Sequence, residues 1–252
     1  MSPARHHYLG IDESDLDREV YRIFSLQRLL ELLRSERNTL VRPSLWDDPF
    51  ENYVLSAVER LKSDERFSIG FKDKLYGQCW TLDRDSDAMW RIYSPDRQGV
   101  RVRSTIRRLL ESLLDTSKSY PELSCFIGKV SYLPQYKLVQ MLNDAGGSGS
   151  GILDPSGRGQ ARTLLVKREE FSHEKEIRLI HFSHEDDYSS EIYQYPINPT
   201  KLIDEVAFDP RLSEEMVDLF SDFFYGLGFS KRQVTHHEAL PPSLEAYKAV
   251  TA

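Results

Sequence analysis

Residues 171–182 read FSHEKEIRLIHF, a run of apolar and charged residues that predicts a β-strand. Side chains alternate along a strand, so Glu174, Glu176 and Arg178 would share one face and the residues between them would face the other way. Two carboxylates placed in this way raise each other's pKa unless a cation lies close, and Arg178 is the candidate cation. In a functional site, one glutamate would hydrogen-bond a sugar hydroxyl or stabilise a cationic transition state, and the other would orient the attacking group. The alternative is a structural ladder of ion pairs on an exposed sheet.

The segments on either side of this stretch predict an α+β fold with mixed, mostly antiparallel sheets and flanking helices. Short β-branched and aromatic runs predict further strands at 20–24, 38–41, 76–82, 99–103, 126–132, 192–193, 206–208 and 232–235. Helical spacing of apolar residues predicts helices after Ser25, over 53–62, 106–114, 137–143 and 216–227, with Asp87 capping a short helix that carries Met89, Trp90 and Tyr93.

The chain is expected to be one domain over residues 20–252, preceded by a polar arm at 1–19. Residues 145–159 read AGGSGSGILDPSGRG and predict a flexible internal loop, because glycine and serine leave the backbone free. Composition does not change across this loop, so we expect no domain boundary there.

The composition is that of a cytoplasmic globular protein. Of 252 residues, 40% are hydrophobic and 29% charged, and we expect no membrane segment or signal peptide. A net charge of -7 argues against a broad nucleic-acid binder. The two cysteines, Cys79 and Cys125, are expected to be reduced thiols in the core.

Several other clusters have both a functional and a structural interpretation. The loop Trp46-Asp47-Asp48-Pro49-Phe50-Glu51 could bind a metal, or its acids could cap helices. The aromatic residues around Trp80, Trp90 and Tyr93 could form a stacking wall for a nucleobase or nicotinamide, or belong to the core. The basic cluster could bind phosphate or be a solvated helix start; it consists of Arg101, Arg103, Arg107 and Arg108. The seven histidines have no metal-binding spacing.

Taken in order along residues 20–238, several motifs resemble a bacterial family, the domain-of-unknown-function family numbered twenty-nine seventy-one. They are Tyr21-Arg22, the loop from Trp46 to Glu51, Tyr76-Gly77-Gln78-Cys79-Trp80-Thr81, Met89-Trp90-Arg91-Ile92-Tyr93-Ser94 with Gly99, and Phe171-Ser172-His173-Glu174-Lys175-Glu176-Ile177-Arg178. The chain departs from that pattern at Trp46-Asp47, where an asparagine-type turn is usual, and at Phe171, where tryptophan is usual.

The same order is similar, more weakly, to ADP-ribosyltransferase folds. This resemblance implies that Arg22 holds the phosphates of NAD, that Thr81 is the serine or threonine of a middle motif, that Glu176 is the catalytic glutamate and that Glu174 is its companion. It also implies cofactor contacts from nearby aromatic residues, namely Tyr21, Trp80, Trp90 and Tyr93. Such chemistry is coherent, because a carboxylate can stabilise an oxocarbenium-like charge and an arginine can hold pyrophosphate.

The leading hypothesis is therefore an enzyme that uses NAD as a substrate, by ADP-ribosyl transfer or NAD glycohydrolysis, acting as a toxin or anti-phage effector. Its partners would be NAD and a protein or nucleic-acid acceptor, with no membrane. One alternative is a metal-dependent nuclease or phosphoesterase that uses Asp47, Asp48 and Glu51 together with Glu174 and Glu176. A further alternative is a non-enzymatic binding module whose aromatic residues form the contact surface.

Overall fold

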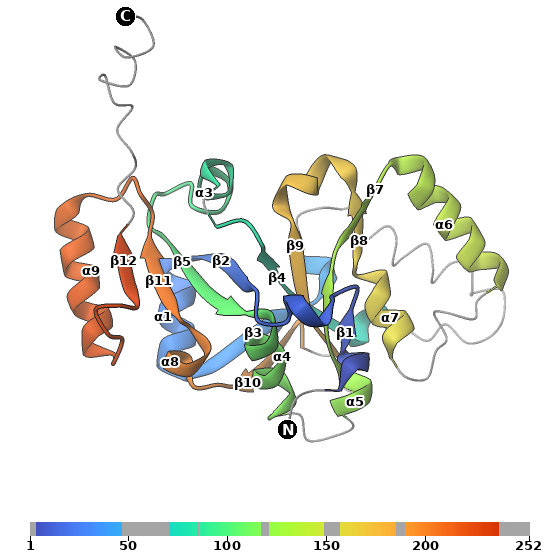
Figure 1. Cartoon of the computed structure of the whole chain (residues 1–252), viewed down its shortest axis with the longest axis horizontal. Coiled ribbons are helices and arrows are strands. Elements are labelled where there is room, and N and C mark those ends of the chain that lie inside the picture. The colour runs from blue at the N-terminus through green and yellow to red at the C-terminus, as the bar shows by residue number, and fades with distance from the viewer. Residues whose placement is uncertain are drawn as a thin grey trace, which may run out of the picture.

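A ten-stranded sheet forms the centre of the computed structural model, which describes residues 4–46, 71–84, 86–116, 121–148, 157–184 and 190–236. Its main path runs β1-β6-β9-β4-β2-β5-β11-β12 (Figure 1). These strands are β1 (Tyr8–Leu9), β6 (Cys125–Lys129), β9 (Glu176–Phe182), β4 (Leu75–Thr81), β2 (Glu19–Ser25), β5 (Gly99–Thr105), β11 (Glu205–Phe208) and β12 (Val234–His236). A side branch contains β3 (Arg37–Val41) and β10 (Ile192–Pro196).

The pairing within this sheet is mostly antiparallel. Among the described strands of this sheet, the parallel pairs lie at its two ends, where β1 pairs with β6 and β11 pairs with β12. A separate parallel pair joins β7 (Ser131–Leu133) to β8 (Val166–Arg168). With helices on its faces, this arrangement confirms the predicted α+β class.

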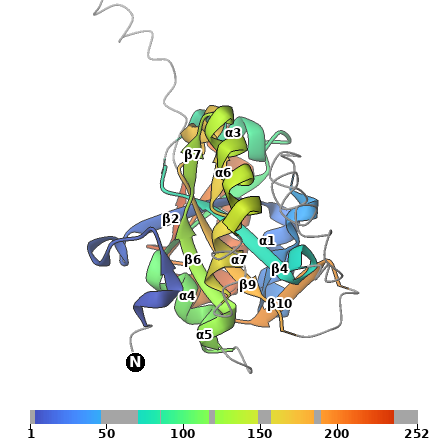
Figure 2. The same cartoon turned by 90° about the vertical axis from the view of Figure 1, so that its right-hand side faces the viewer.

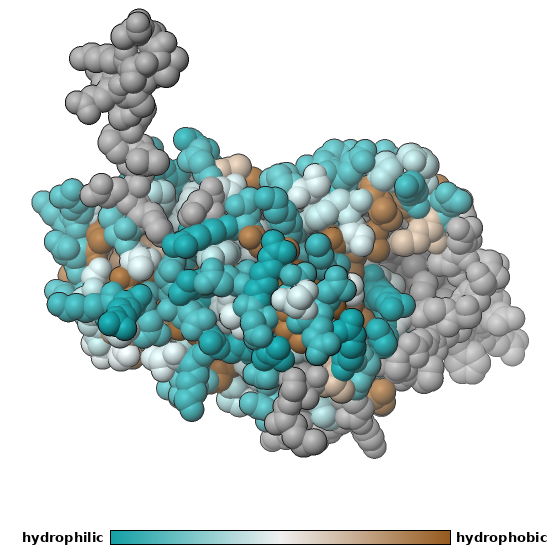
Figure 3. Space-filling view, viewed as in Figure 1, coloured by the Kyte–Doolittle hydropathy of each residue, from teal (hydrophilic) through white to brown (hydrophobic). Residues whose placement is uncertain are grey.

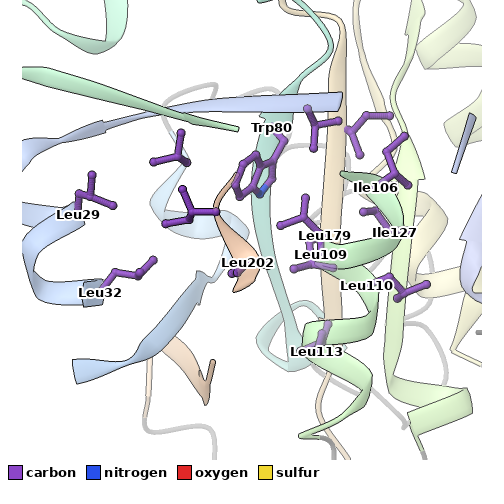
Figure 4. Packing of buried hydrophobic residues seen from close by; sticks show 14 of the residues in the cluster. Leu29, Leu32, Trp80, Ile106, Leu109, Leu110, Leu113, Ile127, Leu179 and Leu202 are labelled. Atoms are coloured by element: carbon purple, nitrogen blue, oxygen red, sulfur yellow. The ribbon is translucent and has the colours of Figure 1, made fainter. Parts of the chain in front are cut away.

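The larger hydrophobic core lies between the sheet and several helices on one face. Helix α1 (Leu26–Ser35) contributes Leu29 and Leu32, and α4 (Ile106–Leu114) contributes four buried residues, Ile106, Leu109, Leu110 and Leu113 (Figure 4). Helices α8 (Pro199–Leu202) and α9 (Glu214–Gly226) extend this core beside β11 and β12. In the orientation of Figure 1, the surface of the described residues is mostly hydrophilic (Figure 3).

A second, smaller core lies on the opposite face of β6 and β9. Residues alternate along β9, so Leu179 joins the larger core and Ile180 joins the smaller one with Phe126. Helix α7 (Arg158–Thr163) covers this face and contacts both strands (Figure 2). The remaining helices are α3 (Asp87–Tyr93), α5 (Pro121–Ser124) and α6 (Gln135–Ser148), and the short 3-10 turns are η1 (Arg5–His7), η2 (Glu13–Asp15), η3 (Pro43–Leu45), η4 (Phe71–Lys74) and η5 (Glu169–Glu174).

Strand β4 is where the sheet forks. One edge of β4 pairs with β9 along its whole length, whereas the other edge is shared by two strands. Gly77 pairs with Val41 of β3, and Thr81 pairs with Tyr21 of β2. Cys79 lies between these two contacts, so the backbone at Cys79 faces the gap between the branches.

Local signals in the sequence predicted the positions of many helices and strands, with bounds that differ by one or more residues in most of them. The Ser25 hydroxyl accepts a hydrogen bond from Arg28 N and caps α1, as expected. The helix over 106–114 is also confirmed. The cap of α3 is Ser86 and not Asp87, which is the first residue inside that helix. The predicted strand 126–132 is interrupted and continues as β7.

The first nineteen residues differ from the arm that we expected. Tyr8 and Leu9 pair with β6, and Tyr8, Leu9, Ile11 and Leu16 are buried. Burial of these apolar residues ties the segment to the domain. Of the predicted loop 145–159, residues 145–148 end α6 and 158–159 begin α7, while 149–156 lie outside the described residues, as does the predicted helix 53–62. No helix in the described ranges is long and apolar enough to cross a membrane.

Candidate active site

The two glutamates do not lie on one strand. Glu174 ends η5, Lys175 adopts a left-handed conformation with φ 45°, and β9 begins at Glu176. This corrects the expectation of a continuous strand over 171–182, because the left-handed residue turns the chain between the two acids. Glu176 and Arg178 do share a face, as the alternation predicted.

Lys167 joins the two carboxylates. Its Nζ lies 2.5 Å from Glu174 Oε2 and 2.7 Å from Glu176 Oε1. The Arg178 Nε donates to Glu176 Oε2 at 2.6 Å, and its guanidinium also donates to the Leu164 carbonyl at 2.6 Å. All four charged side chains are buried, with relative exposures of at most 8%. The pattern is a compact ion-pair network in the interior, in place of an exposed ladder.

The pKa values of the two carboxyls are displaced in opposite directions. Burial, reinforced by the neighbouring Glu176, raises the pKa of Glu174 to about 7. Burial also acts to raise the pKa of Glu176, but the charge of Arg178, with help from Lys167, holds it well below its ordinary value. Glu176 therefore stays ionised near neutral pH, whereas Glu174 can exchange a proton there.

Tyrosines and a threonine surround the pair. The Tyr132 hydroxyl accepts from the backbone N–H of Glu176 at 2.8 Å, and the Tyr93 hydroxyl lies 3.3 Å from Glu174 Oε1. The Thr81 hydroxyl donates to the Glu174 carbonyl at 2.7 Å and accepts from Asp83 N at 2.9 Å. Thr81 thus fixes the turn that carries Glu174.

Arg22 lies at the fork of the sheet. Its guanidinium donates to the Cys79 carbonyl, in the gap between the contacts of β4 with β2 and β3. Burial lowers the pKa of Arg22, and the charge of Glu176 opposes that effect. Its Nε has no hydrogen-bond partner among the described residues. Thr81 pairs with both Tyr21 and Glu176, so the strands bring Arg22, Thr81 and Glu176 together.

The aromatic residues expected to contact a cofactor lie in different environments. Trp80 is buried in the larger core and donates to Gln78 Oε1 at 2.9 Å (Figure 4). Trp90 is 6% exposed and Tyr21 is 3% exposed, with the Tyr21 hydroxyl bonded to Glu19. Of the two interpretations that the sequence left open for Trp80 and Trp90, a stacking wall or the core, their burial favours the core. Only Tyr93 among the four, at 42% exposure, presents its ring to solvent.

The other predicted sites gain less support. Asp47, Asp48 and Glu51 lie outside the described residues, within which no group of acids, histidines and cysteines could hold a metal. Trp46 packs over the Arg178 guanidinium at 4.5 Å. Neither cysteine forms a disulfide; Cys125 is buried and Cys79 is partly buried.

The basic cluster is paired with acids, in place of forming a phosphate-binding face. Its ion pairs are Arg101–Glu205, Arg103–Glu19, Arg107–Asp17 and Arg108–Asp204.

Lys167 and Tyr132 were missed by the sequence analysis. Both belong to the separate pair β7–β8, and that pair reaches the glutamates only through tertiary packing. Lys167 stands seven residues before Glu174 in an ordinary charged stretch, so no local pattern identifies it.

No protein-family model matches the chain, and no curated protein matches it in sequence. The resemblance to the family numbered twenty-nine seventy-one is therefore not confirmed. Among solved structures, Thermus sp. 2.9 DarT in complex with ADP-ribosylated ssDNA matches at 11% identity and a TM-score of 0.40, over 88% of this chain and 95% of that one. Thermus sp. 2.9 DarT in complex with NAD+ matches at 12% identity and a TM-score of 0.38, over 88% and 96%. Similarity at this level does not assign the chain to that fold or give it an activity.

Proposed function

We propose that the chain is an NAD-using enzyme that breaks the nicotinamide–ribose bond, by ADP-ribosyl transfer or by NAD glycohydrolysis. The proposal is carried by Glu174 and Glu176, which meet on Lys167 and have pKa values displaced in opposite directions. Such a pair supplies one ionised carboxylate and one group that can exchange a proton near neutral pH. Cleavage of the nicotinamide–ribose bond uses both. The ionised carboxylate faces the positive charge that develops on the ribose as nicotinamide leaves as a neutral base, and the second group takes the proton of the attacking water or acceptor.

The catalytic roles follow from the surroundings of each acid. Glu176 is the ionised group that would face the developing charge, and Lys167 and Arg178 hold its carboxylate in place. Glu174 is the proton-exchanging group. The Tyr93 hydroxyl lies 3.3 Å from Glu174 Oε1 and the residue as a whole is 42% exposed, so a substrate would approach Glu174 from the side of Tyr93. A nicotinamide ring could stack on Tyr93 at that position.

Arg22 is the group proposed to hold the pyrophosphate of NAD. A guanidinium has five N–H donors, and the described contacts leave the Nε of Arg22 without a partner. Its position at the fork, beside the strand pair that carries Thr81 and Glu176, supports this role. Tyr21 and Thr81 would act indirectly, by positioning Arg22 and the turn at Glu174. Trp80 and Trp90 would support the site from the interior.

The transfer form of the reaction would make the chain a toxin or an anti-phage effector. NAD would be its substrate and a protein or a nucleic acid its acceptor, and the enzyme would act in the cytoplasm without a membrane partner.

Nicotinamide release from NAD tests the proposal directly. The full chain is incubated with NAD, alone and with protein or oligonucleotide acceptors, and released nicotinamide is quantified by chromatography. Glu176→Gln should lower release by at least about a hundredfold, since one positioned electrostatic group contributes that much in other enzymes. Glu170→Gln, which changes an exposed glutamate of η5, the 3-10 turn that ends at Glu174, should leave the rate unchanged.

The proposal fails if release is absent under every condition, or if Glu176→Gln releases nicotinamide as fast as the unmodified chain. Circular dichroism of both variants shows whether a loss of rate reflects chemistry or unfolding.

A non-enzymatic binding module is the second candidate. It is favoured by the closed ion-pair network, in which both oxygens of Glu176 already accept from cations. In that case NAD could bind without turnover, and calorimetry would detect NAD binding that survives Glu176→Gln. A buried network of this kind is compatible with a purely structural role.

A further inference from the structure

A cavity of about 430 Å³ opens at the β1 end of the sheet, where β6 separates β1 from β9. Its lining comes from the N-terminal segment and the first residue of α7, namely Arg5, His6, Tyr8, Gly10, Ile11, Asp12 and Arg158. Strand β1 is an edge of the sheet, at the opposite end from β12. Ligand cavities in proteins span about 300 to 1,000 Å³, so this one has room for a small molecule.

The charges in the cavity suit a phosphate group. Arg5 and Arg158 place two guanidinium groups in its lining, in a chain whose net charge is -7. A guanidinium matches the geometry of phosphate oxygens and can donate two parallel hydrogen bonds. Arg5 has an exposed acidic neighbour, Glu13, at 3.8 Å, which is a loose contact that an anion could displace.

Two polar atoms of lining residues lack hydrogen-bond partners. These are His6 Nε2 and Tyr8 Oη, which are buried and have no partner in the described part of the chain. Tyr8 as a whole is only 6% exposed. Buried polar groups in native proteins are nearly always bonded, so orphans of this kind need an explanation. A ligand oxygen in the cavity is the sort of partner that His6 Nε2 lacks, whereas the Tyr8 hydroxyl lies near Arg107, Glu111 and Asp17.

The remaining lining residues suggest what the phosphate is attached to. Asp12 is exposed, and its carboxylate can accept hydrogen bonds from the hydroxyl groups of a sugar. Ile11 provides an apolar wall. Phosphate, hydroxyls and an apolar face occur together in sugar phosphates and nucleotides.

We propose that this cavity binds a phosphorylated small molecule that carries hydroxyl groups, such as a sugar phosphate or a nucleotide. Arg5 and Arg158 bind its phosphate, Asp12 accepts from its hydroxyls, and His6 supplies a further hydrogen bond. The site contains none of the residues proposed to act on NAD, so the inference does not rest on the proposed function.

Calorimetric titration of the full chain tests the site with inorganic phosphate, ribose 5-phosphate, AMP and unphosphorylated ribose. Ribose 5-phosphate should bind at least about tenfold more tightly than phosphate, and ribose alone should not bind. Arg158→Gln and Arg5→Gln should each weaken ribose 5-phosphate about tenfold or more. Asp12→Asn should lower the affinity for ribose 5-phosphate relative to that for inorganic phosphate, because it weakens the acceptor for the sugar hydroxyls and removes a negative charge that repels both anions.

Arg232→Gln is the matched control, since it removes one positive charge from an exposed position next to β12, at the other end of the sheet. It should leave every affinity unchanged. The inference is overturned if none of the phosphorylated ligands binds, if ribose binds as well as its phosphate, or if both Arg5→Gln and Arg158→Gln bind normally. Nicotinamide release by these variants is measured in parallel, so that failure here and failure of the proposed function remain distinguishable.

Discussion

The ammonium of Lys167 lies between two buried carboxylates, and the ring of Phe171 covers it at 4.5 Å. Replacing this side chain with an apolar one of similar length leaves Glu174 and Glu176 with Arg178 as the nearest cation. Breaking a buried ion pair on one side costs about 3–5 kcal/mol, because the remaining charge is buried without compensation. We therefore expect Lys167→Met to lower the free energy of unfolding at pH 7 by about that amount, as measured by urea denaturation.

Lys175→Met provides the comparison, because Lys175 is eight residues along the same segment but on the surface. Its side chain is 57% exposed and pairs with Asp83 at 3.0 Å. An exposed pair contributes about 0–1 kcal/mol, so this variant should unfold almost like the unmodified chain. The loss in Lys167→Met should also shrink at pH 5, where Glu174 becomes neutral. Equal losses in the two variants would mean that Lys167 does not compensate buried charge.

At the scale of the element, β4 depends on a glycine. A side chain at Gly77 would place its Cβ 2.6 Å from the Trp46 ring, and that ring stacks on the Arg178 guanidinium. Gly77→Ala should push Trp46 away from Arg178 and strain the fork. Overpacking of this kind costs about 1–3 kcal/mol, so we expect a loss of that size in the free energy of unfolding. Tryptophan fluorescence should shift as well, because Trp46 changes its surroundings.

Gly226→Ala adds the same methyl group where nothing lies within 4 Å of the new Cβ. This glycine is the last residue of α9, and alanine favours the helix by up to about 1 kcal/mol. The variant should be neutral or slightly stabilised in the same urea experiment. If Gly77→Ala behaves in the same way, Trp46 can move at no cost and the close approach at β4 has no structural role.

For the whole molecule, features that depend on neighbouring residues were predictable from the sequence. The Ser25 cap, the helix at 106–114 and the strands β2 to β5 all depend on local propensity and apolar spacing. These features sufficed for the α+β class, and alternation along β9 correctly placed Glu176 and Arg178 on one face.

Features that depend on distant contacts were not predictable in this way. Lysine has no special preference for the left-handed conformation that Lys175 adopts. The alternation of residues over 171–182 therefore gave no sign that the strand begins only after Glu174. The fork at β4 joins segments from opposite parts of the chain, and Lys167 reaches the glutamates only through the fold. The burial of Trp80 and Trp90 also depends on which face the helices cover.

The free energy of unfolding of the whole molecule should depend on pH in part through Glu174. Its pKa in the folded state is raised to about 7, above the ordinary value of a glutamate, which the unfolded chain recovers. Between about pH 4.5 and 7 the folded state therefore holds a proton that the unfolded state has lost. The free energy of unfolding contributed by Glu174 must fall as pH rises through this window, by up to about 1.4 kcal/mol per pH unit.

Glu176 and His181 also have displaced pKa values, and their effects on stability differ from that of Glu174. Glu176 has a lowered pKa, so its contribution is present at neutral pH and is lost only as pH falls into the acid range. Burial lowers the pKa of His181 to about 3, so unfolding becomes less favourable as pH rises toward 6.5. Glu176 and His181 are present in both the unmodified chain and Glu174→Gln. Their contributions to the pH dependence of stability therefore largely cancel when these two proteins are compared.

Glu174→Gln removes the titrating carboxyl but keeps its size, and thus isolates this effect. The variant should gain stability relative to the unmodified chain as pH rises from 5 to 8, with most of the gain below pH 7. Urea denaturation at half-unit steps of pH measures it, with the exposed Glu170→Gln as the control whose curve should run parallel to that of the unmodified chain. Parallel curves for Glu174→Gln would show that Glu174 titrates at its ordinary pKa. Glu174 would then be ionised at neutral pH in the folded chain, and it could not serve as the proton-exchanging partner of Glu176.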